Sequence, residues 1–413
     1  MDIVPRGGYR WITSRNKKDM ETNSPVRRLA LKAKQRYTWS TMERYDLIVI
    51  GGGIAGLGVA AEASRRSIKT LVLEARQCGA ATSNNTLRII HGGFRYLQHL
   101  QLSRLIRSLN DQSAVLRDFA QAVQPLPCLM PLARYGLKSK IPVRAASLLY
   151  GLAMKACRSP LPPPTVYSPQ DMTTLAPLVS ELSPHGALCW HDVLMTHPEI
   201  IALALKDHIT QNGGVIQENC PVAEIKRKSG GFHVVTSTGA HLTGTQVINA
   251  LGPWLDSIAV PDALRGNRPE WCKGFNLIVK RQIHPTHAIG IQSKDGRLFF
   301  CVPRGSHTAI GTWYTPARSI PDHHTEATPS HDEIAAFIHS FNAAYPIMAI
   351  SVADIEGIDC GFLPMKKLSP QGPVLYGSEI LHAAHGYGEI MSTKYTTFRS
   401  QAQRSLEKVT ASL

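Results

Sequence analysis

Residues 45–74 read YDLIVIGGGIAGLGVAAEASRRSIKTLVLE, and this stretch decides the fold. Residues 47–50 form a continuous apolar run, which is typical of a strand buried on both faces of a parallel sheet. The small and apolar residues after the glycines predict a helix that packs on this sheet. Residues 69–73, KTLVL, predict a second strand. We therefore expect a strand–helix–strand unit with parallel strands.

The glycines of this unit have the spacing G-x-G-x-x-G. Gly51 allows a tight turn, Gly53 lets a pyrophosphate approach the backbone, and Gly56 lets the helix pack close to the strand. The helix N-terminus favours phosphate. Glu74 ends the second strand, where a carboxylate accepts hydrogen bonds from an adenosine ribose. The unit predicts dinucleotide binding but does not distinguish FAD from NAD.

Composition indicates a globular protein with room for two joined domains. Of 413 residues, 43% are hydrophobic and 18% are charged, and no apolar run reaches the ~18 residues of a membrane span. The eight cysteines form no C-x-x-C pair, and the 17 histidines show no metal-ligand spacing. We therefore predict no metal site and no disulfide framework, and we expect a reducing, cytoplasmic location.

The formal net charge is +15, and its distribution is uneven. Residues 1–41 hold ten basic and three acidic residues without hydrophobic periodicity. We expect this basic N-terminal segment to be disordered and dispensable, with the folded region spanning 42–413. The remaining positive charge favours an anionic substrate, and it leaves an acidic partner or peripheral contact with a membrane open. The chain has no aromatic–basic nucleic-acid motif, so we expect no nucleic-acid partner.

Periodicity predicts the other elements of the chain. We expect residues 189–195 to enter a loop, and residues 355–362 and 374–376 to return to the first sheet. Helices are predicted at about 100–121, 141–157, 169–179, 197–209, 331–344 and 392–409. Strands are predicted at 215–217, 222–228, 232–236 and 245–250, and an antiparallel set at 275–281, 298–302 and 308–312.

Four separated motifs stand out: LRIIHGGFRYL at 87–97, NALGPW at 249–254, VPRGSHTAIGT at 302–312 and STKYTTFR at 392–399. In this order they resemble FAD-dependent glycerol-3-phosphate dehydrogenase of the D-amino-acid oxidase superfamily. Residues 87–97, LRIIHGGFRYL, resemble the family's K-L-I-H-G-G-L-R-Y-L, and residues 249–254, NALGPW, resemble N-A-A-G-P-W. Residues 302–312 resemble P-x-x-G-x-x-x-I-G-T. Residues 392–399, STKYTTFR, resemble G-G-K-L-T-T-Y-R.

This resemblance implies an α/β fold with two domains. One is a Rossmann-like FAD-binding domain with a split, parallel sheet, and the other is an inserted antiparallel-sheet substrate domain. The FAD-binding segments would span about 42–100, 190–256 and 355–413. The substrate-domain or cover segments would span about 101–189 and 257–354.

The resemblance also implies site residues. The catalytic residues would be His91, as a base, with Arg95 and with Lys394 beside the isoalloxazine ring. Tyr96, Arg304 and Leu363 would face the substrate. The cofactor contacts would be Gly51, Gly53, Ile54, Ala55, Gly56, Glu74, Ala75, Thr82, Ser83, Asn84, His91, Gly92, Val222, Ala223, Gly252, Trp254, Gly386, Tyr387 and Gly388.

The implied activity is that of an FAD-dependent dehydrogenase or oxidase. Hydride would pass from a small hydroxylated substrate to flavin N5, and the electrons would then pass to a quinone or O2. Two alternatives remain open at this stage. One is an amine or amino-acid oxidase of the same superfamily, and the other is a flavin-binding subunit with little catalysis.

One departure from the family pattern concerns the substrate. The family places a phosphate-clamping arginine in a G-x-R-P segment, and Leu363 stands at that position in residues 360–364, CGFLP. A second phosphate arginine also has no counterpart near residues 372–374. We therefore expect glycerol 3-phosphate to be a poor substrate, because a bidentate cation is not replaced by an apolar side chain. Arg95, helped by Lys394, would then be the main anion contact.

Overall fold

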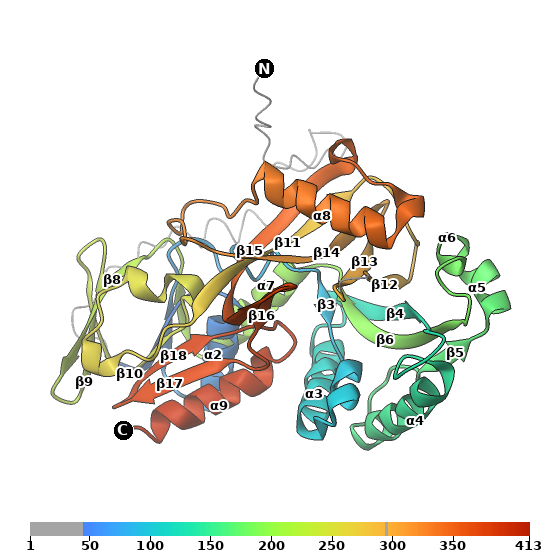
Figure 1. Cartoon of the computed structure of the whole chain (residues 1–413). Helices are drawn as coiled ribbons and strands as arrows, with labels where there is room; N and C mark the ends of the chain where they lie inside the picture. The colour runs from blue at the N-terminus through green and yellow to red at the C-terminus, as the bar shows by residue number, and fades with distance from the viewer. Residues whose placement is uncertain (1–43, 294–295) are drawn as a thin grey trace, which may run out of the picture. The chain divides into compact units, whose positions relative to one another are not determined.

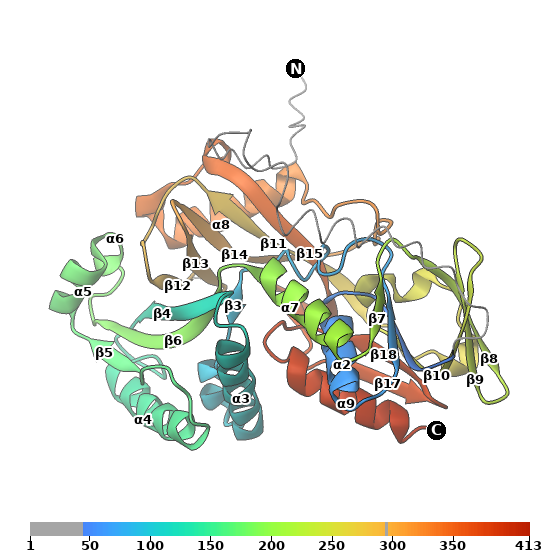
Figure 2. The same ribbon diagram turned by 180° about the vertical axis from the view of Figure 1, so that it is seen from behind.

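The computed structural model describes residues 44–293 and 296–413, which form one compact unit. The basic segment predicted at 1–41 lies outside the described residues. Two sheets organise the described chain, and they are seen from opposite sides in Figures 1 and 2.

The first sheet contains the strand predicted at 47–50. These four residues are at most 1% exposed, as expected for a strand covered on both faces. The strand order is β17-β18-β10-β1-β2-β7, with β9 beside β10 and β8 beside β9. From β18 to β7 all neighbours are parallel. The strands are β1 (Arg44–Ile50), β2 (Thr70–Leu73), β7 (Val215–Gln217), β8 (Val222–Lys228), β9 (Gly231–Thr236), β10 (His241–Asn249), β17 (Ile380–Ala384) and β18 (Tyr387–Met391).

Three helices pack together along one face of this sheet, as Figure 2 shows. They are α2 (Ile54–Arg65), α7 (Pro198–Gln211) and α9 (Phe398–Thr410). Small residues let them approach closely. A Cβ on Gly58 would lie 2.9 Å from the Phe398 ring, and one on Gly388 would lie 2.4 Å from Val409. Gly388 is therefore needed for helix packing.

The second sheet has the order β16-β15-β11-β14-β13-β12-β4-β6-β3, with β5 beside β6. Its pairs are antiparallel except for β12 with β4. Its strands are β3 (Ile89–Ile90), β4 (Val123–Pro131), β5 (Thr165–Tyr167), β6 (Ala187–Met195), β11 (Glu270–Val279), β12 (Ala288–Gln292), β13 (Leu298–Arg304), β14 (His307–Pro316), β15 (Ile355–Ser369) and β16 (Gly372–Leu375).

Helices also cover the second sheet. α8 (His331–Ala344) packs Phe337 and Phe341 against Phe299 of β13. Away from α8, Figure 1 shows α3 (Leu102–Asp118) and α4 (Lys140–Ala156) beside β4 and β6. None of the described helices combines the length and apolar character required to cross a bilayer. The short helices are α5 (Pro169–Leu175), α6 (Pro177–Ser180), η1 (Phe94–His99), η2 (Gly252–Ser257), η3 (Asp262–Leu264), η4 (Pro346–Met348) and η5 (Val352–Asp354).

This architecture confirms the predicted α/β fold with a split parallel sheet. Three local predictions are wrong. Residues 189–195 belong to strand β6 and not to a loop, because the run is buried and pairs with β4 along its length. Residues 355–362 and 374–376 do not return to the first sheet, since β15 pairs with β11 and β16 pairs with β15. The last helix begins at Phe398 and not at Ser392.

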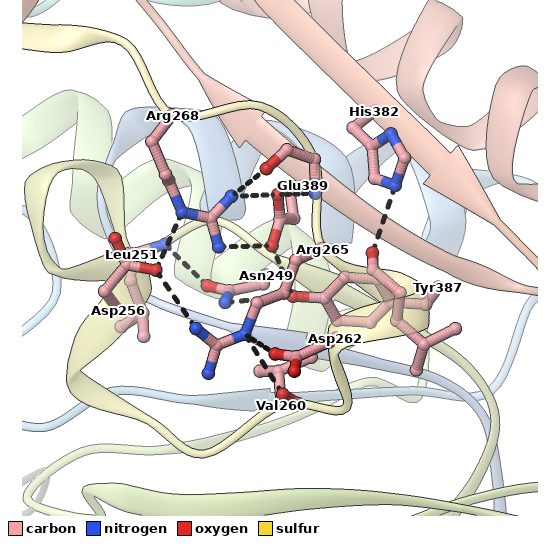
Figure 3. A network of polar contacts seen from close by, with 12 residues as sticks. Asn249, Leu251, Asp256, Val260, Asp262, Arg265, Arg268, His382, Tyr387 and Glu389 are labelled. Carbon is pink, nitrogen blue, oxygen red and sulfur yellow. Dashed lines mark hydrogen bonds and ion pairs between the residues drawn. The ribbon is translucent and has the colours of Figure 1, made fainter.

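A buried ionic network joins β18 to the segment between the two sheets (Figure 3). Glu389 is fully buried and accepts two hydrogen bonds from Arg268, at 2.6 and 3.0 Å. The same carboxylate accepts from the Tyr387 hydroxyl at 3.0 Å and from the Gly266 N–H at 2.9 Å. Arg268 also donates to Asp256 at 2.7 Å. The network therefore fixes residues 256–268 against the first sheet.

Removing one partner of this network should destabilise the fold. We expect Glu389→Ala to lower the free energy of unfolding by about 3 kcal/mol, the lower end for a broken buried pair, because Arg268 keeps Asp256 as a counter-ion while Tyr387 and Gly266 lose their acceptor. Denaturant unfolding measures this change. Glu224→Ala is the matched control, because the Glu224–Lys226 pair is exposed and should cost at most about 1 kcal/mol. Equal stability of Glu389→Ala and the unmodified protein would contradict a structural role for the network.

Candidate functional site

A cavity of about 1010 Å³ lies at the carboxyl ends of β1, β2 and β10 and extends to the second sheet. This is the place where open α/β sheets bind ligands. The sequence-predicted residues that line it are Gly51, Gly53, Ile54, Ala55, Glu74, Ala75, Thr82, Ser83, His91, Arg95, Tyr96, Val222, Gly252, Trp254, Leu363 and Lys394.

The glycine turn forms one wall of the cavity. Gly51 has φ +102°, and a Cβ there would lie 2.7 Å from the Ala250 carbonyl oxygen. A Cβ on Gly56 would lie 1.9 Å from the Gly51 oxygen. Gly53 differs, because its φ is −69° and a Cβ would approach only the Ser83 hydroxyl, at 3.3 Å. Gly51 and Gly56 are thus required by the fold. Gly53 is not, and its lack of a side chain leaves the backbone open to the cavity.

Glu74 lies where the ribose contact is expected. Its carboxylate accepts from the Gly52 N–H at 2.6 Å and from the Arg76 N–H at 2.8 Å. Ser83 accepts from the Ile54 N–H at 2.9 Å, so the loop after β2 is tied to the N-terminus of α2. These bonds hold the first-sheet side of the cavity in a defined shape.

Several predicted residues lie outside this cavity, and each has a structural reason. Gly386, Tyr387 and Gly388 belong to β18 and its preceding turn, where Tyr387 bonds Asn249 and Glu389. Arg304 pairs with Asp359 at 2.9 Å and bonds the Thr86 carbonyl oxygen.

Three further predicted contacts also lie outside the cavity. Gly92 is buried, and a Cβ there would lie 2.1 Å from the Tyr150 hydroxyl. Ala223 is exposed, and its carbonyl oxygen accepts from the Ala259 N–H. Asn84 lines a separate cavity of about 320 Å³ together with Cys78. Burial raises the pKa of the Cys78 thiol, with Glu218 and Glu74 adding to the shift, so it stays protonated.

Strand pairing creates a histidine–aspartate pair in the main cavity. Ile90 of β3 lies opposite Val193 of β6, so the next residues along, His91 and Asp192, come together. The His91 Nδ1 lies 2.9 Å from Asp192 Oδ2. Asp192 is 2% exposed, and its other oxygen accepts from the Gly92 N–H at 2.7 Å. His91 Nδ1 is therefore held in place, which leaves Nε2 for chemistry.

Asp192 was missed by the sequence analysis. It lies in the apolar run ALCWHDVLM, and a single carboxylate inside such a run was the signal that could have indicated a functional residue. The side chain of His91 remains 52% exposed although it lines the cavity, which allows it to contact a ligand.

Positive charge dominates the cavity lining. Among the described residues, its acidic side chains are Glu74 and Asp192, and both are already hydrogen-bonded. The basic side chains are Arg76, Arg88, Arg95, Arg104, Lys138 and Lys394. An excess of cations with few counter-ions favours an anionic ligand.

Lys138 also lines the cavity, although no sequence motif pointed to it. It precedes α4 and donates to Gln292 Oε1, which also lines the cavity. Burial lowers the pKa of Lys138, and the charge of nearby Arg95 lowers it further. Among the described residues, no hydrogen bond or ion pair joins the Arg95 side chain to a neighbour. The two cations therefore share a region that has no carboxylate partner.

Lys394 has a defined position within the same cavity. Its ammonium donates to the Tyr96 hydroxyl and to the Gly377 carbonyl oxygen, the latter at 2.8 Å. It also lies 5.0 Å from the centre of the Tyr96 ring. The sequence had suggested that Lys394 lies in the first turn of the last helix, but Lys394 precedes α9, which begins at Phe398. Tyr96 and Lys394 thus form one unit in the cavity wall.

Apolar side chains line the rest of the second-sheet side. Leu363 of β15 faces the cavity, as expected for a substrate-facing position. It lies beside Tyr314, whose pKa is raised by burial to about 12, so its hydroxyl is neutral. Trp271, Leu298 and Phe300 also line the cavity. This wall leaves room for an apolar part of a ligand.

The described residues contain one grouping with metal-ligand geometry. Asp322, His323 and His324 place ligand atoms within 4.8 Å of one another in the loop before α8. Two of the three are exposed, and such exposed groups are common without an ion. The histidine and cysteine spacings in the sequence indicated no metal site, and this grouping gives no reason to assign one.

The chain is similar to known proteins in both sequence and structure. Residues 46–393 match the model of the family described as DAO: FAD dependent oxidoreductase. Aerobic glycerol-3-phosphate dehydrogenase from Bacillus subtilis (strain 168) is 25% identical over 394 residues, which cover 92% of this chain and 69% of that protein.

Two solved structures share the fold. Glycerol-3-phosphate dehydrogenase from Bacillus halodurans, complexed with FAD, has a TM-score of 0.67 and 20% identity, covering 90% of this chain and 65% of that one. Glycine oxidase from Geobacillus kaustophilus has a TM-score of 0.63 and 16% identity, covering 90% and 95%.

The glycine turn yields a direct test of cofactor binding. Gly53→Val should fold, because the backbone is in an ordinary conformation and the site is open. Its side chain should block the pyrophosphate, so flavin content should fall to roughly a tenth or less. Visible absorbance and analysis of the released cofactor measure this change, and circular dichroism checks the fold. A Gly53→Val protein that keeps a full complement of FAD would contradict this site assignment.

Proposed function

Because the chain belongs to the FAD dependent oxidoreductase family, we propose that it oxidises a small anionic alcohol in the cavity between its two sheets. The observation that carries the substrate proposal is that one cavity is lined both by His91, which Asp192 holds in place, and by the neighbouring cations Arg95 and Lys138. FAD is the cofactor of this family, and the residues of the cavity fit it.

The fit to FAD rests on the first-sheet side. Gly53, Ile54 and Ala55 line the cavity at the N-terminus of α2, where a pyrophosphate is favoured. Glu74 and Val222 would hold the adenosine half. When bound, FAD supplies an acceptor for hydride. The cavity volume of about 1010 Å³ exceeds what a small substrate alone requires.

The His91–Asp192 pair favours an alcohol over an amine. A hydroxyl must lose its proton as the C–H bond is broken, whereas a neutral amine already has a lone pair to offer. His91 Nε2 would accept the hydroxyl proton, and Asp192 would stabilise the resulting imidazolium through Nδ1–H. An amine or amino-acid substrate remains the second candidate, because glycine oxidase shares the fold. The third candidate is a flavin-binding subunit with little catalysis. A failure of every tested substrate to reduce the flavin would favour it.

Arg95 and Lys138 would bind the anionic group of the substrate. Arg95 lies in η1, four residues after His91 in the chain, and both residues line the same cavity. The apolar wall at Leu363 would accommodate a carbon chain larger than that of glycerol. We therefore propose a substrate that joins one anionic group, one hydroxyl and an apolar portion.

The electron acceptor is proposed to be a quinone or O2. The location is proposed to be cytoplasmic with peripheral contact to a membrane. Both proposals rest on the family resemblance and on the positive charge of the chain, +15 overall. The relatives that suggest them are longer, since this chain spans 69% and 65% of two of them.

The anion contact can be tested at Lys138. Lys138→Ala should lower kcat/KM for the preferred anionic substrate by about 10- to 100-fold, since a charge-assisted contact is worth roughly 1.5–3 kcal/mol. Lys140→Ala is the matched control, because Lys140 is exposed and does not line the cavity. Steady-state kinetics with anionic and neutral alcohols measure the change. An equal effect of both substitutions would remove Lys138 from the substrate site.

The apolar wall can be tested at Leu363. We expect kcat/KM for glycerol 3-phosphate to lie below about 10⁵ M⁻¹s⁻¹. Leu363→Arg should raise it relative to neutral substrates, because it adds a cation where the family has one. Efficient turnover of glycerol 3-phosphate by the unmodified protein, with no change in preference after Leu363→Arg, would show that our reading of this position is wrong.

A conservative substitution of Asp192 tests its proposed effect on His91 without removing its contact to the Gly92 N–H. Asp192→Asn keeps an oxygen for the Gly92 N–H but no longer stabilises a protonated His91. We expect kcat to fall by about 10²-fold or more, with flavin content and KM largely retained. Steady-state kinetics on the flavin-loaded protein test this. A loss of flavin or a change confined to KM would instead assign Asp192 a structural or binding role.

A further inference from the structure

Helix α4 presents apolar side chains on two opposite faces. Val143, Tyr150 and Met154 are buried against the protein. On the opposite side, Ile141, Leu148, Leu149 and Leu152 are between 55% and 81% exposed. An amphipathic surface helix normally turns polar residues outward, so a second apolar face indicates a partner.

The neighbouring segments carry further exposed apolar side chains. α3 and α4 are in contact, with Cys157 Sγ 4.0 Å from the Ile106 carbonyl oxygen, and both views of the chain show them side by side. Of the 16 large hydrophobic residues that are exposed in the described chain, nine lie between residues 100 and 152. We call this surface the α3–α4 face: Leu100, Leu102, Ile106, Tyr135, Leu137, Ile141, Leu148, Leu149 and Leu152.

The charged residues on and beside α4 are all of one sign. Between Asp118 and Asp171 the sequence contains no acidic residue. In that interval it has six cations: Arg134, Lys138, Lys140, Arg144, Lys155 and Arg158. All but Lys138 are exposed. Long basic side chains beside exposed leucines are the pattern of a helix that lies in the interface of an anionic bilayer.

We propose that the α3–α4 face docks on a membrane surface that contains anionic lipid, with α4 lying in the plane of the interface. A second copy of this chain fits the face less well. A two-fold dimer would place the same patch on both partners, and the cations would then meet cations with no carboxylate between Asp118 and Asp171 to pair with them. Anionic headgroups supply that missing charge.

The proposed docking surface borders the cavity. Gln101 and Arg104, at the beginning of α3, line the cavity, as does Lys138 before α4. Leu100 and Leu102 lie in the same stretch and are exposed. Docking would therefore bring this part of the cavity wall close to the headgroups. The proposal deepens the peripheral membrane contact of the proposed function, but docking itself does not require the chain to be catalytic.

The test is sedimentation of the full flavin-loaded chain with phosphatidylcholine vesicles, with and without phosphatidylglycerol. We expect binding to the anionic vesicles, weakened by salt. The triple variant Leu148→Ser, Leu149→Ser, Leu152→Ser should bind about tenfold more weakly or worse, because it removes the apolar contacts. This variant leaves the charge of the chain, including the basic segment 1–41, unchanged.

Leu203→Ser with Leu368→Ser is the matched control, since both side chains are exposed outside the α3–α4 face. This control should bind as the unmodified protein does. Flavin content and melting temperature show that each variant is folded. The proposal is overturned if the unmodified protein ignores anionic vesicles, or if the triple variant binds them equally well. It is also overturned if the triple variant merely converts a dimer into a monomer, which would assign the face to a second copy.

Discussion

The described structure depends on a close approach of three backbone segments around Gly51. The turn after β1 lies against the end of β10, and the first turn of α2 lies against the turn. No side chain fits at Gly51 or Gly56, because a Cβ would meet a carbonyl oxygen at 2.7 or 1.9 Å. This constraint brings the carboxyl ends of β1, β2 and β10 together, so the cavity opens where helix N-terminal N–H groups are available.

The histidine–aspartate pair of the candidate site comes from the second sheet and depends on pairing between distant residues. β3 is only two residues long, yet its register with β6 places His91 opposite Asp192, 101 positions later in the chain. Lys138 comes from a third segment. The buried Glu389–Arg268 pair fixes the connection from the first sheet towards β11. In the proposed function, the first sheet would supply the cofactor contacts and the second sheet would supply contacts to the substrate.

Local sequence was sufficient for the parts of the site that are local in the chain. Gly51, Gly53, Glu74 and the residues from His91 to Tyr96 other than Gly92 line the cavity. Asp192 and Lys138 could not be found in the same way, because their roles arise from strand register and from a loop that meets Arg95 only in the fold. Gly386–Tyr387–Gly388 shows the opposite error. A glycine-rich pattern suggested cofactor contact, but Gly388 makes room for Val409 of α9.

The most direct test of the account is anaerobic reduction of the bound flavin by candidate substrates. The purified, flavin-loaded protein is mixed without O2 with hydroxy acids, polyol phosphates, neutral alcohols and amines, and the visible flavin absorbance is followed. We predict that an anionic alcohol with an apolar portion bleaches the flavin fastest, and that glycerol 3-phosphate, neutral alcohols and amines are slower. Bleaching by amines alone, or no bleaching by any candidate while dithionite reduces the same flavin, would contradict the proposed oxidation of an anionic alcohol.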